Sequence, residues 1–165
     1  MKKYLLDSNV LIQAHRMYYP FDVVPGFWQK LLFLSGKSSI ISIDKVKNEI
    51  CGNSTEDDLS KWCSTQLDSG FFVNTESCID VYAQIAEWVN SHAVFSQSAK
   101  ELFLSTELAD PWLVAYAQKN NCTVVTHEIS QPHRRNRIKI PEPCDRFGVR
   151  WITPIEMFRD LKETF

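Results

Sequence analysis

Short apolar segments alternate with helical segments along this chain. KYLLD and CTVVT are apolar at successive positions, which is typical of strands buried on both faces, and SSIISI is rich in β-branched residues. GFFV and VRWIT are two further candidate strands. The alternation predicts an α/β protein with three layers, α/β/α, around a central, mainly parallel sheet. Helical spacing and capping residues predict helices over residues 9–16, 27–37, 44–50, 56–67, 75–92, 98–105, 110–120 and 154–164.

Length and composition narrow the functions that such a fold can have. With 165 residues, the chain is expected to form one domain over residues 1–165, because two cores would each be close to the lower size limit. The formal net charge of -2 excludes binding to polyanions through overall charge, so a nucleic acid must be held by a local basic patch or by metal ions. Five cysteines without a C-x-x-C pair favour free thiols in a reducing cytoplasm. No apolar run approaches the roughly 20 residues that cross a membrane.

Acidic residues follow two of the predicted strands. Asp7 ends the first strand, and Glu128 follows CTVVT by two residues. In open α/β folds, ligands bind beyond the carboxyl ends of the strands. If these two strands are parallel and adjacent, both carboxylates belong to that edge of the sheet.

Two further acids are expected at the same edge. Glu49 lies three residues after Val46, whose side chain must face the core, and so Glu49 borders the buried face of its helix. Asp110 opens a helix whose next residues are nearly all apolar, and a helix that packs antiparallel to its strands begins at their carboxyl ends. Four acids are therefore expected to converge on one cleft: Asp7, Glu49, Asp110 and Glu128.

A cleft with four carboxylates needs cations, because carboxylates a few ångströms apart repel one another when all of them are ionised. Mg²⁺ and Mn²⁺ prefer oxygen ligands, and two such ions roughly 4 Å apart can activate water and stabilise a reacting phosphate. The four acids are therefore predicted to be both catalytic and metal-binding. The reaction that this chemistry indicates is hydrolysis of phosphodiester bonds.

These motifs resemble the PIN domain, a metal-dependent nuclease fold, and in particular its toxin-like members. The matching segments are YLLDSNVLI for the first acid, ISIDKVKNEI for the helix glutamate and ADPWLVAYAQKNNCTVVTHE for the third and fourth acids. Together with IKIPEPCDRFGVRWITPIEMF, they are similar to a PIN-like subfamily known as a domain of unknown function. The resemblance implies a PIN-like fold and a ribonuclease that uses Mg²⁺ or Mn²⁺, with Asp7, Glu49 and Asp110 as the core acids and Glu128 as the fourth.

The fourth position departs from the commoner family pattern, in which a threonine is followed two residues later by aspartate. Here Thr126 precedes Glu128, and the longer side chain is expected to reach a metal through water. The resemblance suggests that Thr126 orients a metal water and that Ser8 or Asn9 supports Asp7. Ser8 or Asn9 is also expected to cap the first helix.

Each acid also has a purely structural interpretation. Asp7 and Asp110 can cap helices, and Glu49 and Glu128 can be solvated surface residues. The order of the acids along the chain favours a functional site. Asp7 ends the first strand, Glu49 lies on the helix after the second strand, and Asp110 opens a helix that leads into a further strand. Helix caps alone would not produce this order.

A basic run, HRRNRIK, follows the fourth acid over residues 133–139. It can hold an RNA backbone, since phosphate neutralisation provides much of the affinity for nucleic acids, and a solvated loop is the alternative. His127 is left out of the catalytic set, because hydrolysis with metal ions needs no separate base. The aromatic segment MYYPF can stack bases, bind a partner or belong to the core. The candidate RNA contacts are Arg134, Arg135, Arg137 and Lys139.

The sequence therefore predicts a metal-dependent endoribonuclease that acts on RNA. The resemblance implies the toxin of a type II toxin–antitoxin pair, with a protein antitoxin over the acidic cleft, and a homodimer is a further expectation. The alternatives are a housekeeping RNA-processing nuclease, a non-catalytic PIN-like binding module and an aspartyl-phosphate phosphatase. The motif of that phosphatase has a second aspartate where this chain has Asn9.

Overall fold

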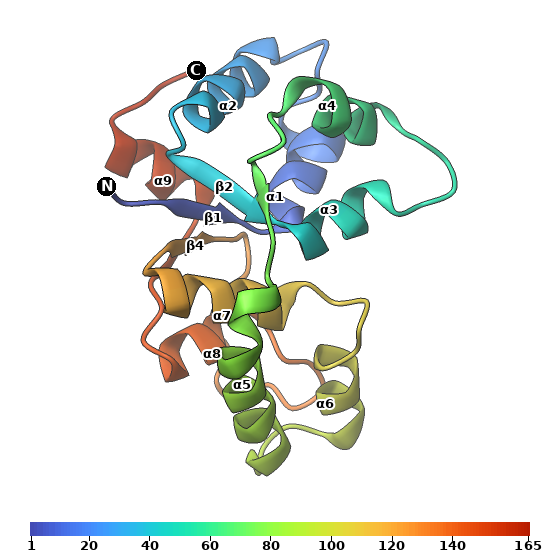
Figure 1. The fold of residues 1–165 in the computed structure, drawn as a ribbon, viewed down its shortest axis with the longest axis vertical. Coiled ribbons are helices and arrows are strands. Elements are labelled where there is room, and N and C mark those ends of the chain that lie inside the picture. The colour runs from blue at the N-terminus through green and yellow to red at the C-terminus, as the bar shows by residue number, and fades with distance from the viewer.

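Five short strands form one parallel sheet. The computed structural model describes all 165 residues and arranges the strands in the order β3-β2-β1-β4-β5 (Figure 1). Every neighbouring pair is parallel, so the predicted α/β class is confirmed and the sheet is entirely parallel. The strands are β1 (Tyr4–Leu6), β2 (Ile40–Ile43), β3 (Phe72–Val73), β4 (Thr123–Val125) and β5 (Trp151–Ile152).

Helices lie on both sides of the strands, as the three-layer prediction requires. Figure 1 shows α1 to α4 on one side and α5 to α8 on the other. A π-helix, η1 (Ala14–Tyr18), continues α1, and a 3₁₀ turn, η2 (Glu76–Cys78), precedes α5. The α-helices are α1 (Ser8–Gln13), α2 (Pro25–Gly36), α3 (Asp44–Cys51), α4 (Asp58–Gln66), α5 (Ile79–Ser91), α6 (Gln97–Phe103), α7 (Asp110–Asn120), α8 (Pro141–Arg146) and α9 (Pro154–Leu161).

The short helix α8 is the one α-helix that the sequence pattern does not predict. It has six residues, two of which are Pro141 and Pro143. Both prolines lie in the first turn, where the backbone N–H groups have no partner within the helix and proline is tolerated. The segment is too short to show helical periodicity, and so its sequence resembles a loop.

The start of α1 differs from the expectation in two ways. Ser8 is already helical, and the residue at the N-cap position is Asp7, whose side chain makes no capping hydrogen bond. The prediction that Ser8 or Asn9 caps this helix is therefore wrong. At the other end, the Tyr19 N–H donates to the Ala14 carbonyl at 2.7 Å, five residues back, which is the spacing of a π-helix.

The core is built from the strands and from one face of each helix. All three residues of β1 are buried, as its continuous apolar pattern predicts, and all four of β2 are buried too, including Ser42. Leu113, Val114 and Ala115 of α7 are fully buried, so this helix packs closely on the sheet. None of the helices is both long enough and apolar enough to span a membrane.

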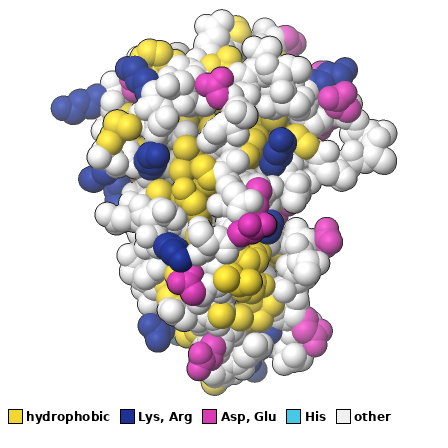
Figure 2. All heavy atoms as spheres, in the orientation of Figure 1, with side chains coloured by type: hydrophobic (Ala, Val, Ile, Leu, Met, Phe, Trp, Pro, Cys, Tyr) yellow, Lys and Arg dark blue, Asp and Glu magenta, His cyan; other side chains and the backbone are white.

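The strand order reverses its direction between β1 and β4. From β1 the chain proceeds to β2 and β3 on one side, and from β4 it proceeds to β5 on the other. Such a switch point opens a crevice at the carboxyl ends of the two central strands, which is where ligands bind in open parallel sheets. On the face that Figure 2 shows, acidic and basic side chains are interspersed, in agreement with the small net charge of -2.

Candidate active site

Thr126, directly after β4, joins two of the predicted acids. Its hydroxyl donates to Oδ2 of Asp7 at 3.1 Å and accepts from the backbone N–H of Glu128 at 3.1 Å. The parallel pairing of β1 with β4 brings these residues together, and the Asp7 N–H donates to the Val125 carbonyl at 3.0 Å. The ends of both strands therefore meet at the switch point of the sheet.

This bridge gives a first testable prediction. Thr126→Val is expected to lower the free energy of unfolding by about 1–3 kcal/mol, because it leaves buried polar groups of Asp7 and Glu128 without a partner. Thr126→Ser retains the hydroxyl and is the matched control. Urea denaturation measures both variants, and equal stability of the valine and serine variants would contradict the bridging role.

Asp110 is the first residue of α7, and it is only 8% exposed. The N-cap position of α7 is occupied by Ala109, so the interpretation of Asp110 as the helix cap is wrong. The N–H of Ala109, one residue earlier, donates to Oε1 of Glu49 at 2.8 Å. This bond links α3 to the start of α7 and holds Glu49 next to the segment that carries Asp110.

Burial and mutual repulsion raise the pKa values of both aspartates. Burial raises the pKa of Asp7 from 3.8 to about 7, and the charges of Glu128 and Glu49 add to the rise, whereas the hydrogen bond from Thr126 opposes it. Burial also raises the pKa of Asp110 well above 3.8, and the charges of Asp7 and both glutamates act in the same direction. The four acids therefore repel one another and form one electrostatic cluster.

Both glutamates are already bound by the protein. Oε2 of Glu128 accepts from the Ile140 N–H at 2.7 Å, and its Oε1 lies 3.6 Å from Nζ of Lys139. Glu49 is bound by the Ala109 N–H. In this arrangement no group of three or more His, Cys, Asp or Glu side chains is positioned to hold a metal ion. The glutamates therefore contribute charge to the cluster and also pin backbone segments on either side of it.

The chemistry of the four side chains nevertheless fits a hard divalent cation. Carboxylate oxygens are the ligands that Mg²⁺ and Mn²⁺ prefer. Burial and the neighbouring acids raise the pKa values of Asp7 and Asp110, so nearby positive charge does not offset these two effects. Arg137 lowers the pKa of Asp110, but this effect is smaller than that of burial and of the three other acids. A divalent cation would supply the missing charge, and the four acids are the residues that would hold it.

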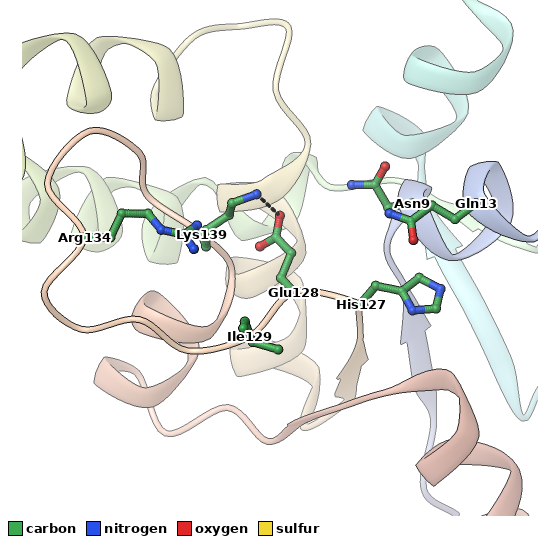
Figure 3. A pocket seen from close by; sticks show the side chains of 7 residues that line it. All are labelled: Asn9, Gln13, His127, Glu128, Ile129, Arg134 and Lys139. Atoms are coloured by element: carbon green, nitrogen blue, oxygen red, sulfur yellow. Dashed lines mark ion pairs between the residues drawn. The ribbon is translucent and has the colours of Figure 1, made fainter. Parts of the chain in front are cut away.

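Two polar pockets adjoin the cluster, each beside one glutamate. The first, of about 240 Å³, contains Glu128 and Lys139 on one wall and Asn9 and Gln13 of α1 on the other (Figure 3). The second, of about 310 Å³, contains Glu49 and has no hydrophobic residue in its lining. Each glutamate therefore borders a polar pocket, whereas the buried Asp7 and Asp110 line neither of the two.

The residues expected to support Asp7 do so in different ways. Oγ of Ser8 donates to Oδ1 of Asp7 over a long distance of 3.4 Å. The backbone N–H of Asn9 lowers the pKa of Asp7, while the Asn9 side chain lines the first pocket. Asn9 thus faces the space that a substrate would enter, a position that its sequence motif alone does not reveal.

Three of the four predicted basic residues lie beside the acidic cluster. Arg134 lines the first pocket, and Lys139 lines it too while pairing with Glu128. Arg137 lies near enough to lower the pKa of Asp110. Together these three side chains give the cleft a local basic rim, although the whole chain is slightly acidic.

Arg135 differs from the other three basic residues. Its side chain is exposed and makes no hydrogen bond or ion pair with the site. Its carbonyl accepts from the Ser96 N–H at 2.8 Å, which ties the basic loop to the start of α6. The structure therefore gives the backbone of Arg135 a positioning role.

Three residues of the first pocket lie outside the set predicted from sequence: Gln13, His127 and Ile129. Gln13 lies four residues after Asn9 on α1, a spacing that places both amides on one face of the helix and could have indicated it. His127 lines the same pocket, and burial lowers its pKa, which favours the uncharged ring.

The overall fold is similar to that of a solved structure, "Structure of FitAB bound to IR36 DNA fragment". The TM-score is 0.55, with 17% identity over 92% of this chain and 94% of that chain. The five-stranded parallel sheet with flanking helices matches a PIN-like fold. No curated protein matches the sequence.

The comparison with family models is more specific. The model described as "Domain of unknown function (DUF4411)" matches residues 4–165. The chain belongs to this family.

Proposed function

We propose that this protein is an endoribonuclease that depends on Mg²⁺ or Mn²⁺ and hydrolyses RNA phosphodiester bonds. The observation that carries the proposal is the cluster of Asp7, Glu49, Asp110 and Glu128 at the switch point of the sheet, in which burial and repulsion raise the pKa values of both aspartates. Strongly perturbed carboxylates in a cleft are typical of functional sites. The PIN-like fold and the motif resemblance support the same reaction class.

Different residues of the chain have different roles in this reaction. A divalent cation held by the four acids supplies the Lewis acidity that phosphodiester hydrolysis needs. Thr126 fixes the orientation of Asp7, and the Ala109 N–H fixes that of Glu49. Arg134 and Arg137, on the loop beside the cluster, hold the phosphates of the RNA strand in front of the acids.

A finer part of the proposal is that the enzyme is the toxin of a toxin–antitoxin pair. The support is the resemblance of its motifs to toxin-like PIN domains, together with the likeness of its fold to that of FitAB, which was solved with a DNA fragment. An antitoxin would be a protein that covers the acidic cleft. A housekeeping nuclease would have the same cleavage chemistry but no such inhibitor.

An RNA cleavage assay tests the proposal. The protein is incubated with RNA and Mg²⁺ or Mn²⁺, and the assay is repeated in EDTA and with the variants Asp7→Asn and Asp110→Asn. Cleavage is expected only with the cation and the intact acids. Activity that persists in EDTA, or in both variants, would contradict the proposal. No cleavage of any RNA by the intact protein would favour a non-catalytic binding module.

The basic rim gives a separate prediction on RNA binding. The double variant Arg134→Gln with Arg137→Gln is expected to weaken binding and to reduce the slope of log K against log salt by about 1.4, because each phosphate contact to a single strand contributes about 0.7. Fluorescence anisotropy in EDTA, between about 50 and about 200 mM salt, measures the slope without cleavage.

The matched control for this loop is Arg159→Gln, since Arg159 lies in the last turn of α9, outside the pockets that adjoin the acids. This variant is expected to bind RNA with the affinity and salt dependence of the intact protein. An equal effect of the loop variant and the control would show that the basic loop is solvated and has no specific role.

A further inference from the structure

The π-helix η1 places an aromatic side chain at the rim of the first pocket. Tyr18 is the last residue of η1 and is 51% exposed, so about half of its surface faces solvent. Its ring centroid lies 5.6 Å from that of His127, and the two planes are tilted by 45°. π-helical turns are rare and are frequently found at functional sites. The local geometry thus presents Tyr18 toward solvent next to a residue that lines the pocket.

The Tyr18 ring lies beside two other rings, those of His127 and Tyr19, whose centroids are 5.6 and 6.2 Å from its own, and the residue is still 51% exposed. His127 packs against it from the pocket wall, and the 5.6 Å between the ring centroids is too short for a third ring to enter, because each stacked layer is about 3.5 Å thick. The remaining exposed half of Tyr18 can accept a flat partner. Aromatic side chains that present a free face are the usual stacking platforms for bases of single-stranded nucleic acids.

The pocket beside this ring offers hydrogen-bonding groups of the right kind. Asn9 and Gln13 are four residues apart on α1, line the pocket together, and make no side-chain hydrogen bond within the protein. Figure 3 shows both amides facing Glu128 and Lys139 across the pocket. A carboxamide donates and accepts at the same time, which matches the edge of a nucleobase.

We propose that Tyr18, backed by His127, stacks on an unpaired base of the RNA strand, and that Asn9 and Gln13 contact the edge of a base in the adjoining pocket. This proposal rests on the proposed ribonuclease function and specifies its substrate as single-stranded RNA. The base lies beside the phosphate that faces the acids, since Glu128 lines the same pocket as His127. A base in a duplex cannot bind in this way, because stacked neighbours cover both of its faces.

A protein partner is the competing occupant of this rim. Met17 and Ile129 are 67% and 60% exposed, and with Tyr18 they provide apolar surface for a protein. The composition of the adjoining pocket favours RNA, because only one of its seven lining residues is hydrophobic. Arg134 and Lys139 at the same pocket also suit a phosphodiester backbone better than an apolar protein surface.

The experiment uses a single-stranded RNA oligonucleotide that contains 2-aminopurine, whose fluorescence is quenched when it stacks on an aromatic ring. Binding is followed with the Asp7→Asn protein, which does not cleave the probe. The variants Tyr18→Phe and Tyr18→Leu are made in this background. Phe33→Leu is the matched control, because Phe33 is also a half-exposed aromatic residue, at 46%, but lies on α2.

The tyrosine, phenylalanine and control proteins are expected to quench the probe and to bind with equal affinity. Tyr18→Leu is expected to lose the quenching and to bind roughly tenfold more weakly, in line with the usual effect of removing one stacked base. The same probe annealed to its complement is expected to show no quenching by any of these proteins.

Full quenching and unchanged affinity with Tyr18→Leu would overturn the proposed base site and would leave the apolar rim to a protein partner. The experiment would give a different result if the proposed ribonuclease function itself were wrong. An intact protein that neither cleaves nor binds any RNA overturns both proposals. An intact protein that cleaves RNA while Tyr18→Leu still quenches overturns the base site alone.

Discussion

Replacing Asp7 by asparagine is expected to lower the rate of RNA cleavage by about three orders of magnitude. Asp7 is 1% exposed and lies at the switch point between β1 and β4, where its carboxylate is coupled to the other three acids. Asparagine has almost the same shape but no charge, so it would remove one proposed ligand of the cation without opening a cavity. The same change at Asp110 is expected to have a similar effect.

The control for this loss is a carboxylate outside the cluster. Asp68 is exposed and precedes β3 at the edge of the sheet, so Asp68→Asn is expected to retain full activity. Initial rates of cleavage of a labelled RNA, at saturating Mg²⁺, separate the three variants. A loss of less than tenfold with both Asp7→Asn and Asp110→Asn would show that the acidic cluster is not the catalytic centre.

The second large effect concerns stability, and it has a definite dependence on pH. Between pH values of about 4 and 7, the native state holds a proton on Asp7 that the unfolded chain has released, because burial raises the pKa from 3.8 to about 7. Raising the pH through this window therefore favours the unfolded state. One pKa unit corresponds to about 1.4 kcal/mol, so the full cost above pH 7 is about 4 kcal/mol.

Asp7→Asn isolates this contribution from the other acids. The variant and the intact protein are expected to differ least below about pH 3, where Asp7 is protonated in both states of the intact protein because the pH lies below its unfolded-state pKa of 3.8. Near pH 8 the variant is expected to be more stable by up to several kcal/mol. Urea denaturation in EDTA at a series of pH values measures the difference, and a difference that does not change with pH would contradict the coupling of Asp7 to its surroundings.

Addition of Mn²⁺ at pH 8 extends the same experiment. A cation that binds the folded cluster stabilises the native state by mass action. The intact protein is therefore expected to gain stability, and Asp7→Asn is expected to gain much less. An equal gain in both proteins would place the bound cation elsewhere on the chain.

The fold was predictable from the sequence because its three central strands, β2, β1 and β4, are buried on both faces. Leu5 and Leu6, like Val124 and Val125, are fully buried, and such strands are apolar at every position. The position of Asp7 at a strand end followed from the same pattern. The sequence could predict that Asp7 and Glu128 lie close together only on the condition that β1 and β4 are adjacent. The adjacency of these two strands depends on long-range packing, which the sequence pattern does not show.

Other features of the site have no local signal in the sequence. The bond from the Ile140 N–H to Glu128 joins residues 12 positions apart, and the bond from the Ala109 N–H to Glu49 joins residues 60 positions apart. No periodicity encodes contacts of this kind. The π-helix is also hidden, because the predicted helix ends at residue 16, and nothing in the sequence marks the wider turn that brings Tyr18 next to His127.

Under the proposed function, the attachment of Glu128 also affects how tightly RNA can be held. The loop that carries the arginines is closed at its base by the bond between Glu128 and the Ile140 N–H, and Glu142 accepts from the Gln131 N–H at 2.5 Å. Conformational freedom in this loop is therefore lost when the protein folds, before any RNA arrives. An RNA strand that binds would contact cationic groups on a loop that is already ordered. Less of the binding free energy would therefore be lost to ordering of the protein.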